Sequence, residues 1–400
     1  MSDRPRKSES GEDYRTWQRV SVTVSGTPYS VATKPGVFAH GRTDPAAVML
    51  AEQIDVPARA TVVHMNAGNG LFGSAASPRA ERVLLTDRNV LSVDAARRTL
   101  AANNATNAEV LLGHGAFGLP ADLAADLVAI RTPHEKLALL QLLSDAFRIL
   151  KVGGRCYIAG ANNEGIKTAA RTLEKLYGNA GVVTYDSGHR IIAAVKRTDA
   201  PASAEDLENP FLRSETFNEL DATLRGRQLA LFTRPGVFSW DHVDEATQIL
   251  ADAMQIEPGE SVLDLGCGSG ALGVIAAMLS QTGRVTMVDA DVEAVRSSVR
   301  TADAAGIAGY RALTSDVAAA VRDEQFDVVV TNPPFHVGKA TDLNVPLQFI
   351  EEAWEVLAPR GRLFLVANRT LPYERVIYQR FGNIGTLVDG RRFKVLMATR

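Results

Sequence analysis

The chain has 400 residues, of which 46% are apolar and 22% are charged, an ordinary globular composition that is long enough for two domains. A net charge of −3 excludes a polycation, so any binding of nucleic acid has to rely on a local basic surface. The two cysteines, Cys156 and Cys267, stand far apart and predict neither a disulfide framework nor a metal site.

Residues 1–13 are polar and are predicted to form a flexible tail. They lack the apolar core of a secretion signal, and no apolar run in the chain is long enough to cross a membrane. We therefore expect a cytoplasmic protein that is not attached to a membrane. A first domain is predicted over residues 14–198, and residues 199–213, rich in Ala, Pro, Ser and acidic residues, are predicted to form a linker to a second domain over 214–400.

The second half of the chain repeats the first at an offset of 200 residues. TRPGVF at 233–238 corresponds to TKPGVF at 33–38, and CGSG at 267–270 corresponds to AGNG at 67–70. Later, APRGRLFLVANRT parallels KVGGRCYIAGANN in the first half. Ordered matches at this spacing exclude a short-period solenoid and indicate two copies of one domain fused in tandem.

Apolar strands and amphipathic helices alternate in both halves. In the second half, strands are predicted at SVLDLG, RVTMVDAD, FDVVVTN and GRLFLVAN, and helices at DEATQILADAMQ and ALGVIAAMLS. This alternation predicts an α/β fold with a doubly wound, mainly parallel sheet in each copy. Ligands of such sheets bind beyond the carboxyl ends of the strands, where the polar motifs of this chain also stand.

The stretch DLGCGSG joins the first of these strands to the next helix. Gly266, Gly268 and Gly270 permit a tight turn and a close approach of a ligand to bare backbone. The preceding acid, Asp264, would repel a pyrophosphate but suits a cationic ligand with an ammonium or sulfonium group. The pattern therefore favours S-adenosylmethionine over NAD.

Acidic residues follow the next two strands. Asp289 stands about 20 residues beyond the glycine loop, where a carboxylate can bind both ribose hydroxyls. Asp291 fits better as the cap of the following helix. Asp316 follows a third strand and either meets the adenine amino group or is an ordinary solvated loop acid.

The strand FDVVVT ends in Asn-Pro-Pro-Phe, and we predict that Asn332, Pro333, Pro334 and Phe335 are catalytic. Proline fixes its own φ and holds the preceding residue extended, so the Asn332 amide and the Pro333 carbonyl offer two acceptors on a rigid corner. Accepting both hydrogens of a base amino group aims its lone pair at a sulfonium methyl and stabilises the positive charge that develops. Phe335 offers a stacking face worth roughly 1–3 kcal/mol. The alternative is an ordinary proline turn with a core phenylalanine.

The motifs PGVFS, DLGCGSG, TNPPFH, VANRTLPY and FKVLMA, together with the tandem architecture, resemble the bacterial ribosomal RNA guanine-N2 methyltransferases of the RsmC/RlmG type. This resemblance covers nearly the whole chain. It implies two class I methyltransferase-like, Rossmann-like domains that use S-adenosylmethionine to methylate a guanine amine in ribosomal RNA, with the small subunit favoured. It also implies that residues 332–335 clasp the amine and that Phe238, Asp244 and Asn332 border the cofactor.

Two other functions remain open at this point. N-methyltransferases that act on adenine or on a protein glutamine also use Asn-Pro-Pro motifs, which close more often with Tyr than with Phe. A non-catalytic RNA-binding or assembly factor is the third interpretation, but the intact DLGCGSG and TNPPF stretches count against it. We expect a monomer whose partner is ribosomal RNA or a ribosomal subunit.

The first copy has lost the residues that the second is predicted to use. His64 stands at the position of Asp264, and Arg131 at the position of Asn332. The sequence therefore predicts a degenerate domain that is kept for stability or for RNA contact, although glycines and one acid of the pocket remain. The retained residues are Gly68, Gly70 and Asp87. The basic residues that can touch phosphates, unless they are only solvated surface, are Arg88, Arg97, Arg98, Arg131, His134 and Lys136.

Overall fold

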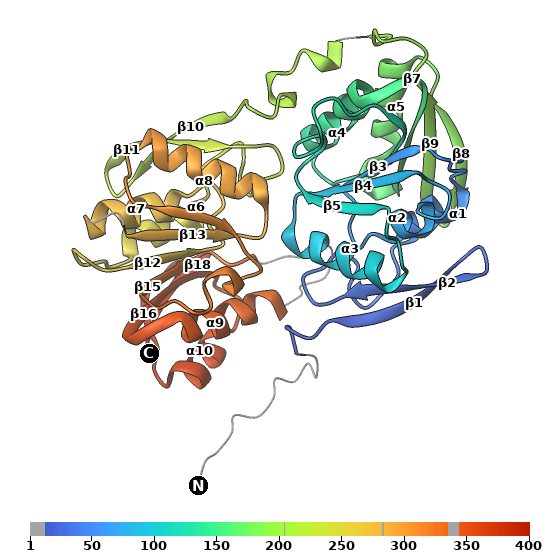
Figure 1. Cartoon of the computed structure of the whole chain (residues 1–400). Helices are drawn as coiled ribbons and strands as arrows, with labels where there is room; N and C mark the ends of the chain where they lie inside the picture. The colour runs from blue at the N-terminus through green and yellow to red at the C-terminus, as the bar shows by residue number, and fades with distance from the viewer. Residues whose placement is uncertain (1–12, 204, 282–283, 335–343) are drawn as a thin grey trace.

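The computed structural model describes residues 13–203, 205–281, 284–334 and 344–400. Two α/β domains lie side by side, the first in blue to green and the second in yellow to red in Figure 1. Each domain consists of a two-stranded hairpin and a seven-stranded sheet with helices packed on both faces. The predicted tandem arrangement of doubly wound domains is thereby confirmed.

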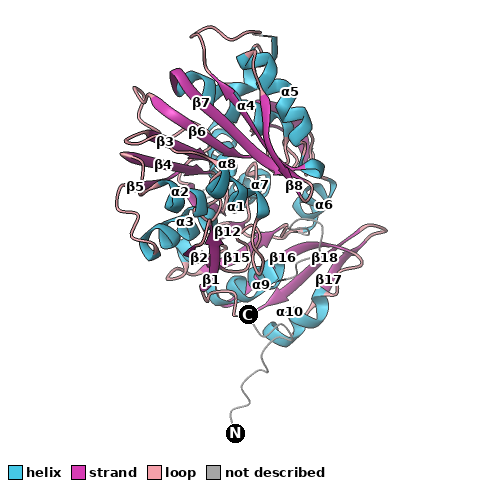
Figure 2. Cartoon of the chain, turned by 90° about the vertical axis from the view of Figure 1, so that its right-hand side faces the viewer, coloured by secondary structure: helices cyan, strands magenta, loops and turns pink. Residues whose placement is uncertain are grey.

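The first domain begins with the hairpin β1 (Gln18–Val24) and β2 (Thr27–Thr33). Its sheet has the strand order β5-β4-β3-β6-β7-β9-β8, of which the part from β5 to β7 can be followed in the upper part of Figure 2. The strands are β3 (Thr61–Met65), β4 (Arg82–Asp87), β5 (Ala108–Leu112), β6 (Ala125–Arg131), β7 (Leu150–Ala161), β8 (Gly181–Asp186) and β9 (His189–Val195). The helices are α1 (Pro45–Gln53), α2 (Leu71–Ala76), α3 (Val90–Ala102), α4 (Lys136–Ile149) and α5 (Ile166–Tyr177).

The second domain has the same order, β14-β13-β12-β15-β16-β18-β17, beside the hairpin β10 (Asn218–Leu224) and β11 (Arg227–Thr233). The strands are β12 (Val262–Leu265), β13 (Val285–Asp289), β14 (Arg311–Thr314), β15 (Phe326–Thr331), β16 (Leu357–Asn368), β17 (Gly385–Asp389) and β18 (Phe393–Thr399). The helices are α6 (Glu245–Ala253), α7 (Ala271–Ser280), α8 (Val292–Ala304), α9 (Asn344–Val356) and α10 (Tyr373–Phe381). In both sheets the last two strands of the order run antiparallel to their neighbours, and the other pairs are parallel.

The hairpin registers match the sequence repeat. Gln18 pairs with Thr33 in the first hairpin, and Asn218 pairs with Thr233 in the second, at the same offset of 200 residues. Because side chains alternate between faces along a strand, a slip of one residue would have turned the other face inward. The identical register therefore shows that the two copies fold with the same faces buried.

The strand β15 shows how the sheet forms the core. Val328, Val329 and Val330 are all fully buried, although they point alternately to opposite faces. Val328 and Val330 pack with α6 and α7 residues such as Leu250, while Val329 packs with α9 residues such as Ile350. A continuous apolar run is therefore a buried strand covered on both sides, and its carboxyl end delivers Asn332 to the edge of the sheet.

The two domains meet through nearly equivalent loops. Asn89 and Asp291 form an antiparallel backbone bridge, and the Val90 N–H donates to the Ala290 carbonyl at 2.9 Å. The Arg88 guanidinium crosses this contact to pair with Asp291 at 2.6 Å. Since the bridged residues open α3 and α8, each of which follows the same strand of its sheet, the copies face each other with approximate twofold symmetry.

The segment before β1 also reaches the second domain. The Tyr14 ring is buried in the core formed by β12, β15 and α9, and Arg15 pairs with Glu352 at 3.1 Å. Tyr14 and Arg15 fall in the range predicted for the first domain, but they contact the second domain. The linker contains two short 3₁₀ turns, Glu205–Leu207 and Pro210–Leu212. Within the described ranges, no helix is long and apolar enough to span a membrane, and no group of three or more potential metal ligands was found.

Candidate functional site

A cavity of about 490 Å³ opens at the carboxyl ends of β12, β13, β14 and β15. It is lined mainly by the second domain, but Tyr14, Gly36, Asn89 and Leu91 of the first domain complete the wall. The predicted site residues that line it are Phe238, Asp244, Gly266, Gly268, Asp289, Asp316, Asn332, Pro333 and Pro334. Asp264 and Gly270 are not at its surface, and Phe335 lies outside the described residues.

The glycine loop follows β12 and turns into α7. Gly268 has φ +53°, and a side chain added there would meet no atom within 4 Å, so its backbone faces open space. At Gly270, with φ +82°, an added Cβ would lie 2.8 Å from the Ser298 Cβ. Gly268 is therefore where a ligand can approach the backbone, whereas Gly270 permits close packing of the loop against α8.

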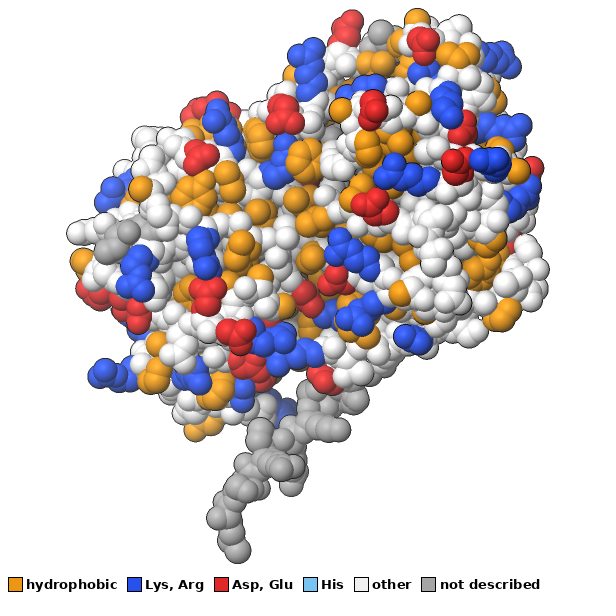
Figure 3. Space-filling view, viewed as in Figure 1, with side chains coloured by type: hydrophobic (Ala, Val, Ile, Leu, Met, Phe, Trp, Pro, Cys, Tyr) orange, Lys and Arg blue, Asp and Glu red, His pale blue; other side chains and the backbone are white. Residues whose placement is uncertain are grey.

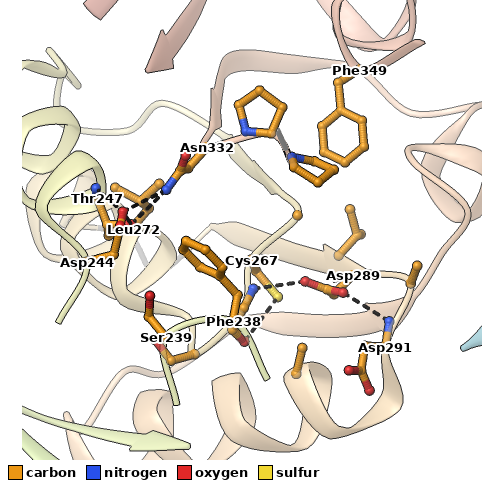
Figure 4. Close-up of a pocket in the computed structure, with 18 of the residues that line it drawn as sticks. Phe238, Ser239, Asp244, Thr247, Cys267, Leu272, Asp289, Asp291, Asn332 and Phe349 are labelled. Carbon is orange, nitrogen blue, oxygen red and sulfur yellow. Dashed lines mark hydrogen bonds between the residues drawn. The ribbon is translucent and has the colours of Figure 1, made fainter. Parts of the chain in front are cut away.

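Asp289 lies at the end of β13 and holds this loop in place (Figure 4). One carboxylate oxygen accepts from the Gly268 N–H and the other from the Asp291 N–H, both at 2.9 Å. Burial raises the pKa of Asp289 to about 6. Asp291 caps α8 by accepting from the Glu293 N–H, as its sequence position predicts. The carboxylate of Asp289 is thus fixed at the cavity wall with lone pairs that can still accept hydroxyl hydrogens.

Asp264 points away from the cavity, beneath the glycine loop. It is fully buried, and its Oδ2 accepts from the Gly273 N–H of α7 at 2.8 Å. Its Oδ1 has no hydrogen-bond partner among the described residues. Burial, reinforced by the neighbouring Asp289, raises the pKa of Asp264 to about 7. The sequence suggested that this carboxylate touches a cationic ligand. The structure instead places it away from the cavity surface, where it cannot make that contact.

Asp264 makes the stability of the protein depend on pH in a predictable direction. Because its folded pKa of about 7 exceeds the ordinary value of 3.8, the folded state holds a proton that the unfolded chain releases. The resulting stability is full below pH 3.8 and is lost as the pH rises through 7. We expect Asp264→Asn, which stays neutral, to gain stability relative to wild type between pH 5 and pH 8. Chemical denaturation of both proteins across that range measures this difference, and a difference that is independent of pH would contradict it.

The Asn332 side chain is anchored through its nitrogen (Figure 4). Nδ2 donates to the Asp244 Oδ2 and to the Thr247 Oγ1, each at 3.0 Å. Asp244 is itself fixed as the N-cap of α6, where it accepts from the Thr247 N–H at 2.8 Å. Because both amide hydrogens are used, Oδ1 must face away from Asp244, and it is buried without a partner among the described residues. A buried acceptor in this state requires a donor, and Asn332 is one of the residues that line the cavity.

The proline corner and an exposed aromatic ring line the same cavity as Asn332. Pro333 and Pro334 line the cavity directly after Asn332, and Thr331 ties the strand end to β12 through a 2.7 Å bond to the Leu265 carbonyl. Phe238 also lines the cavity, and its side chain is 61% exposed. A large exposed aromatic next to buried acceptors offers a stacking surface for a planar ligand.

Asp316 is held by the first domain. Its Oδ1 accepts from the Tyr14 hydroxyl at 2.8 Å, and its Oδ2 accepts from the Lys34 ammonium. Lys34 is buried, with its ammonium 4.2 Å from the centre of the Tyr14 ring. The interpretation of Asp316 as a solvated loop acid is therefore wrong, because it is an interdomain ion-pair partner that also lines the cavity.

In the first domain, Arg131 occupies the position equivalent to Asn332. Its guanidinium pairs with Asp44 at 3.1 Å and with Glu164 at 2.6 Å, and it lies 4.8 Å from the centre of the Phe38 ring. His64, at the position of Asp264, is buried, and burial lowers its pKa to about 3. The Arg131 guanidinium thus stands at the position where the second domain has the Asn332 amide, whose oxygen has no partner among the described residues.

Two of the basic residues proposed for phosphate contact are unavailable. Arg131 is only 8% exposed and pairs with two carboxylates, and the Arg88 side chain is 13% exposed and pairs with Asp291 across the domain contact. For these two residues the prediction was wrong, because neighbouring carboxylates of the protein already bind them. Arg97 remains half exposed, beside Asp94.

Sequence reasoning missed Thr247, Tyr14 and Lys34, which hold Asn332 and Asp316 in place. Thr247 was detectable, since it stands at the third position after the N-cap Asp244, where a capping partner is expected. Tyr14 and Lys34 gave no comparable signal. They act across the domain contact, and nothing in the local sequence indicates which residues of one domain will face the other.

Comparison with known proteins places this chain in a family. The family model of the methyltransferase small domain matches twice, over residues 28–193 and 228–397. The ribosomal RNA small subunit methyltransferase C of Hahella chejuensis is 35% identical over 285 residues, which cover 71% of this chain and 80% of that protein. The protein of the same name from Vibrio vulnificus is 31% identical and covers 70% and 79%, respectively.

A solved structure matches both domains together. It is the T. thermophilus RsmC, a methyltransferase for N2 of guanine 1207 of 16S ribosomal RNA, in complex with S-adenosylmethionine and guanosine. The two chains superimpose with a TM-score of 0.80 at 30% identity, covering 96% of this chain and 98% of the other. The similarity therefore includes the degenerate domain and the arrangement of the pair.

Proposed function

Because this chain belongs to the family of the ribosomal RNA small subunit methyltransferases C, built from two methyltransferase small domains, we propose that it methylates the exocyclic N2 amine of a guanine in small-subunit ribosomal RNA. The observation that carries the proposal is the Oδ1 of Asn332, a residue that lines the cavity: this oxygen is buried and has no hydrogen-bond partner among the described residues. The residues present fit the cofactor S-adenosylmethionine, which supplies an electrophilic methyl group when bound. Gly268 offers open backbone, and Asp289 and Asp316 are carboxylates suited to ribose hydroxyls and an adenine amino group.

The chemistry required of the protein is positioning and electrostatic stabilisation. Asn332 Oδ1 and the Pro333 carbonyl accept the two amine hydrogens, which leaves the nitrogen lone pair directed away from them. When the nitrogen takes the methyl group, the C–S bond of the sulfonium breaks and leaves a neutral thioether. The nitrogen would then become positive, and the same two oxygens would stabilise that charge. The proton leaves to solvent afterwards, so no strong base has to precede the attack. Asp244 and Thr247 act by holding the amide in this orientation.

The exposed Phe238 supports a base that has left its stack. A paired guanine presents its amine in the minor groove, where this cavity cannot reach it, so the nucleotide has to be flipped at a cost of a few kcal/mol. Stacking on an aromatic ring such as Phe238 stabilises a flipped base by roughly 1–3 kcal/mol, which offsets part of that cost. The family membership and the intact second site speak against a non-catalytic factor, and the choice among amino-group substrates is left to experiment.

The test offers tritiated S-adenosylmethionine with 30S subunits, free 16S ribosomal RNA, 50S subunits, DNA or a release factor. We expect label in 16S ribosomal RNA or the 30S subunit, recovered after digestion as N2-methylguanosine. The decisive control replaces the modified guanosine by inosine, which lacks only the exocyclic amine and must accept no label. Label in adenine, in DNA or in the release factor would replace the proposal by one of its alternatives.

We also propose that the protein acts as a cytoplasmic monomer without membrane attachment. Tyr14, Gly36, Asn89 and Leu91 of the same chain complete the cavity wall, so no second copy is required. Sedimentation of the purified protein at working concentration tests the oligomeric state.

A further inference from the structure

Two arginine-bearing loops stand next to Asn332. The strands β15 and β16 are parallel, so Asn332 and Arg369, which follow them, leave the same edge of the sheet. β18 runs antiparallel to β16 and begins at that edge, directly after Arg391 and Arg392. A backbone bond of 2.8 Å from the Arg369 N–H to the Arg392 carbonyl joins the loops, and Figure 2 shows β16, β18 and β17 side by side.

These arginines are held only weakly by the protein. The Arg392 side chain is 72% exposed and pairs at 2.5 Å with Glu245, the residue that follows the Asn332 anchor Asp244. The Arg369 side chain is 53% exposed and pairs with Asp389 at 3.3 Å. Arg391 is exposed and has no ion-pair partner in the described ranges. Exposed pairs of this kind contribute about 0–1 kcal/mol, so the guanidinium groups can exchange them for another anion at little cost.

The degenerate domain provides an internal comparison. There the equivalent backbone bond, 2.9 Å long, joins the Asn162 N–H to the Gly188 carbonyl, so Asn162 and Gly188 stand where the second domain has Arg369 and Arg392. The hairpin turn of the first domain contains only residues 187–188, whereas that of the second contains residues 390–392. Both domains share the fold, but the longer turn with its arginines is found in the domain that keeps the residues predicted to bind the amine. In the domain that has lost these residues, the turn is short and carries no arginine.

We propose that Arg369, Arg391 and Arg392, here called the arginine edge, bind phosphates of the substrate RNA beside the flipped guanine. This inference rests on the proposed function. A flipped nucleotide brings its own phosphate and those of its neighbours to the mouth of the cavity, and guanidinium groups bind phosphate in bidentate geometry. The chain has a net charge of −3, and basic and acidic side chains are interspersed on the face shown in Figure 3. Phosphate binding therefore requires a local arrangement of this kind.

The experiment measures RNA affinity as a function of salt concentration. Each phosphate contact to a single strand contributes about −0.7 to the slope of log K against log salt, so replacing all three arginines by alanine should reduce the slope by about 2. We expect the KM for RNA to rise roughly ten-fold for that variant. The affinity for S-adenosylmethionine, measured by calorimetry, should not change, because these side chains do not line the cavity.

Matched variants separate the possible outcomes. Arg391→Ala removes no ion pair and should reduce the slope by about 0.7, while Arg391→Lys should restore it. Arg322 lies before the amino end of β15, is exposed and has no ion-pair partner in the part of the chain that the structure describes. It serves as a control, and Arg322→Ala should leave binding unchanged. An unaltered slope in Arg391→Ala and in the triple variant would overturn the proposal. Failure of the wild-type protein to label RNA would instead refute the proposed function.

Discussion

Asn332→Ala is expected to lower kcat for methyl transfer by about 10²–10³-fold, the usual effect of removing one preorganised group from an electrostatic site. The variant removes the buried oxygen that would accept an amine hydrogen and also frees Asp244 and Thr247 from their shared donor. Single-turnover rates with bound cofactor and RNA measure the chemical step directly. Cofactor affinity should be retained, because Gly268, Asp289 and Asp316 remain in place.

Two further variants test the orientation of the amide rather than its presence. Asn332→Asp keeps an oxygen at the same place but sets a second carboxylate against Asp244, so it should be nearly as slow as the alanine variant. Thr247→Val removes one of the two anchors and should give an intermediate rate, with the KM for RNA unchanged. If Asn332→Ala methylates RNA at the wild-type rate, the proposed role of this residue fails even though the family assignment stands.

Lys34→Met is expected to weaken binding of S-adenosylmethionine by roughly 10- to 100-fold, although Lys34 belongs to the degenerate domain. Its buried ammonium holds one oxygen of Asp316, whose other oxygen is held by Tyr14. Without the cation, Asp316 keeps a single partner and turns toward solvent, away from the position proposed for the adenine amino group. We expect a loss of affinity nearer to 10-fold than to 100-fold, because the Asp316 side chain is 22% exposed and solvent screens its pairing with Lys34.

A double-mutant cycle separates this effect from general damage. Calorimetry measures the binding free energy of S-adenosylmethionine for Lys34→Met, Asp316→Asn and the double variant. The losses in the single variants should be far from additive, because Lys34 acts on the cofactor only through the Asp316 carboxylate. Lys34→Arg should restore much of the affinity, and the thermal midpoints of the variants report loss of stability separately. Additive losses, or an unchanged affinity in Lys34→Met, would show that the first domain supports the cofactor site only through packing.

Local pattern was sufficient to predict the elements that position the site. FDVVVT is a run of apolar β-formers that ends in Asn-Pro-Pro, and it forms β15 with the predicted polar residue at its carboxyl end. Asp291 was predicted as a cap because a short acid preceded a helix, and it is one. The repeat at an offset of 200 residues predicted the second copy, since glycine turns and buried strands recur in the same order.

Features that depend on packing between elements could not be predicted in this way. Asp264 lies on a strand covered on both faces, so alternation along the strand could not show that its carboxylate points toward Gly273 rather than to the ligand. Arg131 reads as an available cation until Asp44 and Glu164 are seen beside it. The contacts of Asp316 required knowledge of the domain pairing. In each case the deciding partner is distant in sequence.

The bridge between Asn89 and Asp291 has a consequence for how such a chain evolves. Two copies that meet by equivalent loops are arranged like the subunits of a symmetric dimer. Fusion means that one gene encodes both subunits as a single chain. Once joined, each copy mutates separately, and a catalytic centre can be erased from one of them. The copy itself cannot be deleted, because Tyr14, Gly36 and Leu91 still form a wall of its neighbour's cavity. Selection can therefore discard one centre while it retains both folds.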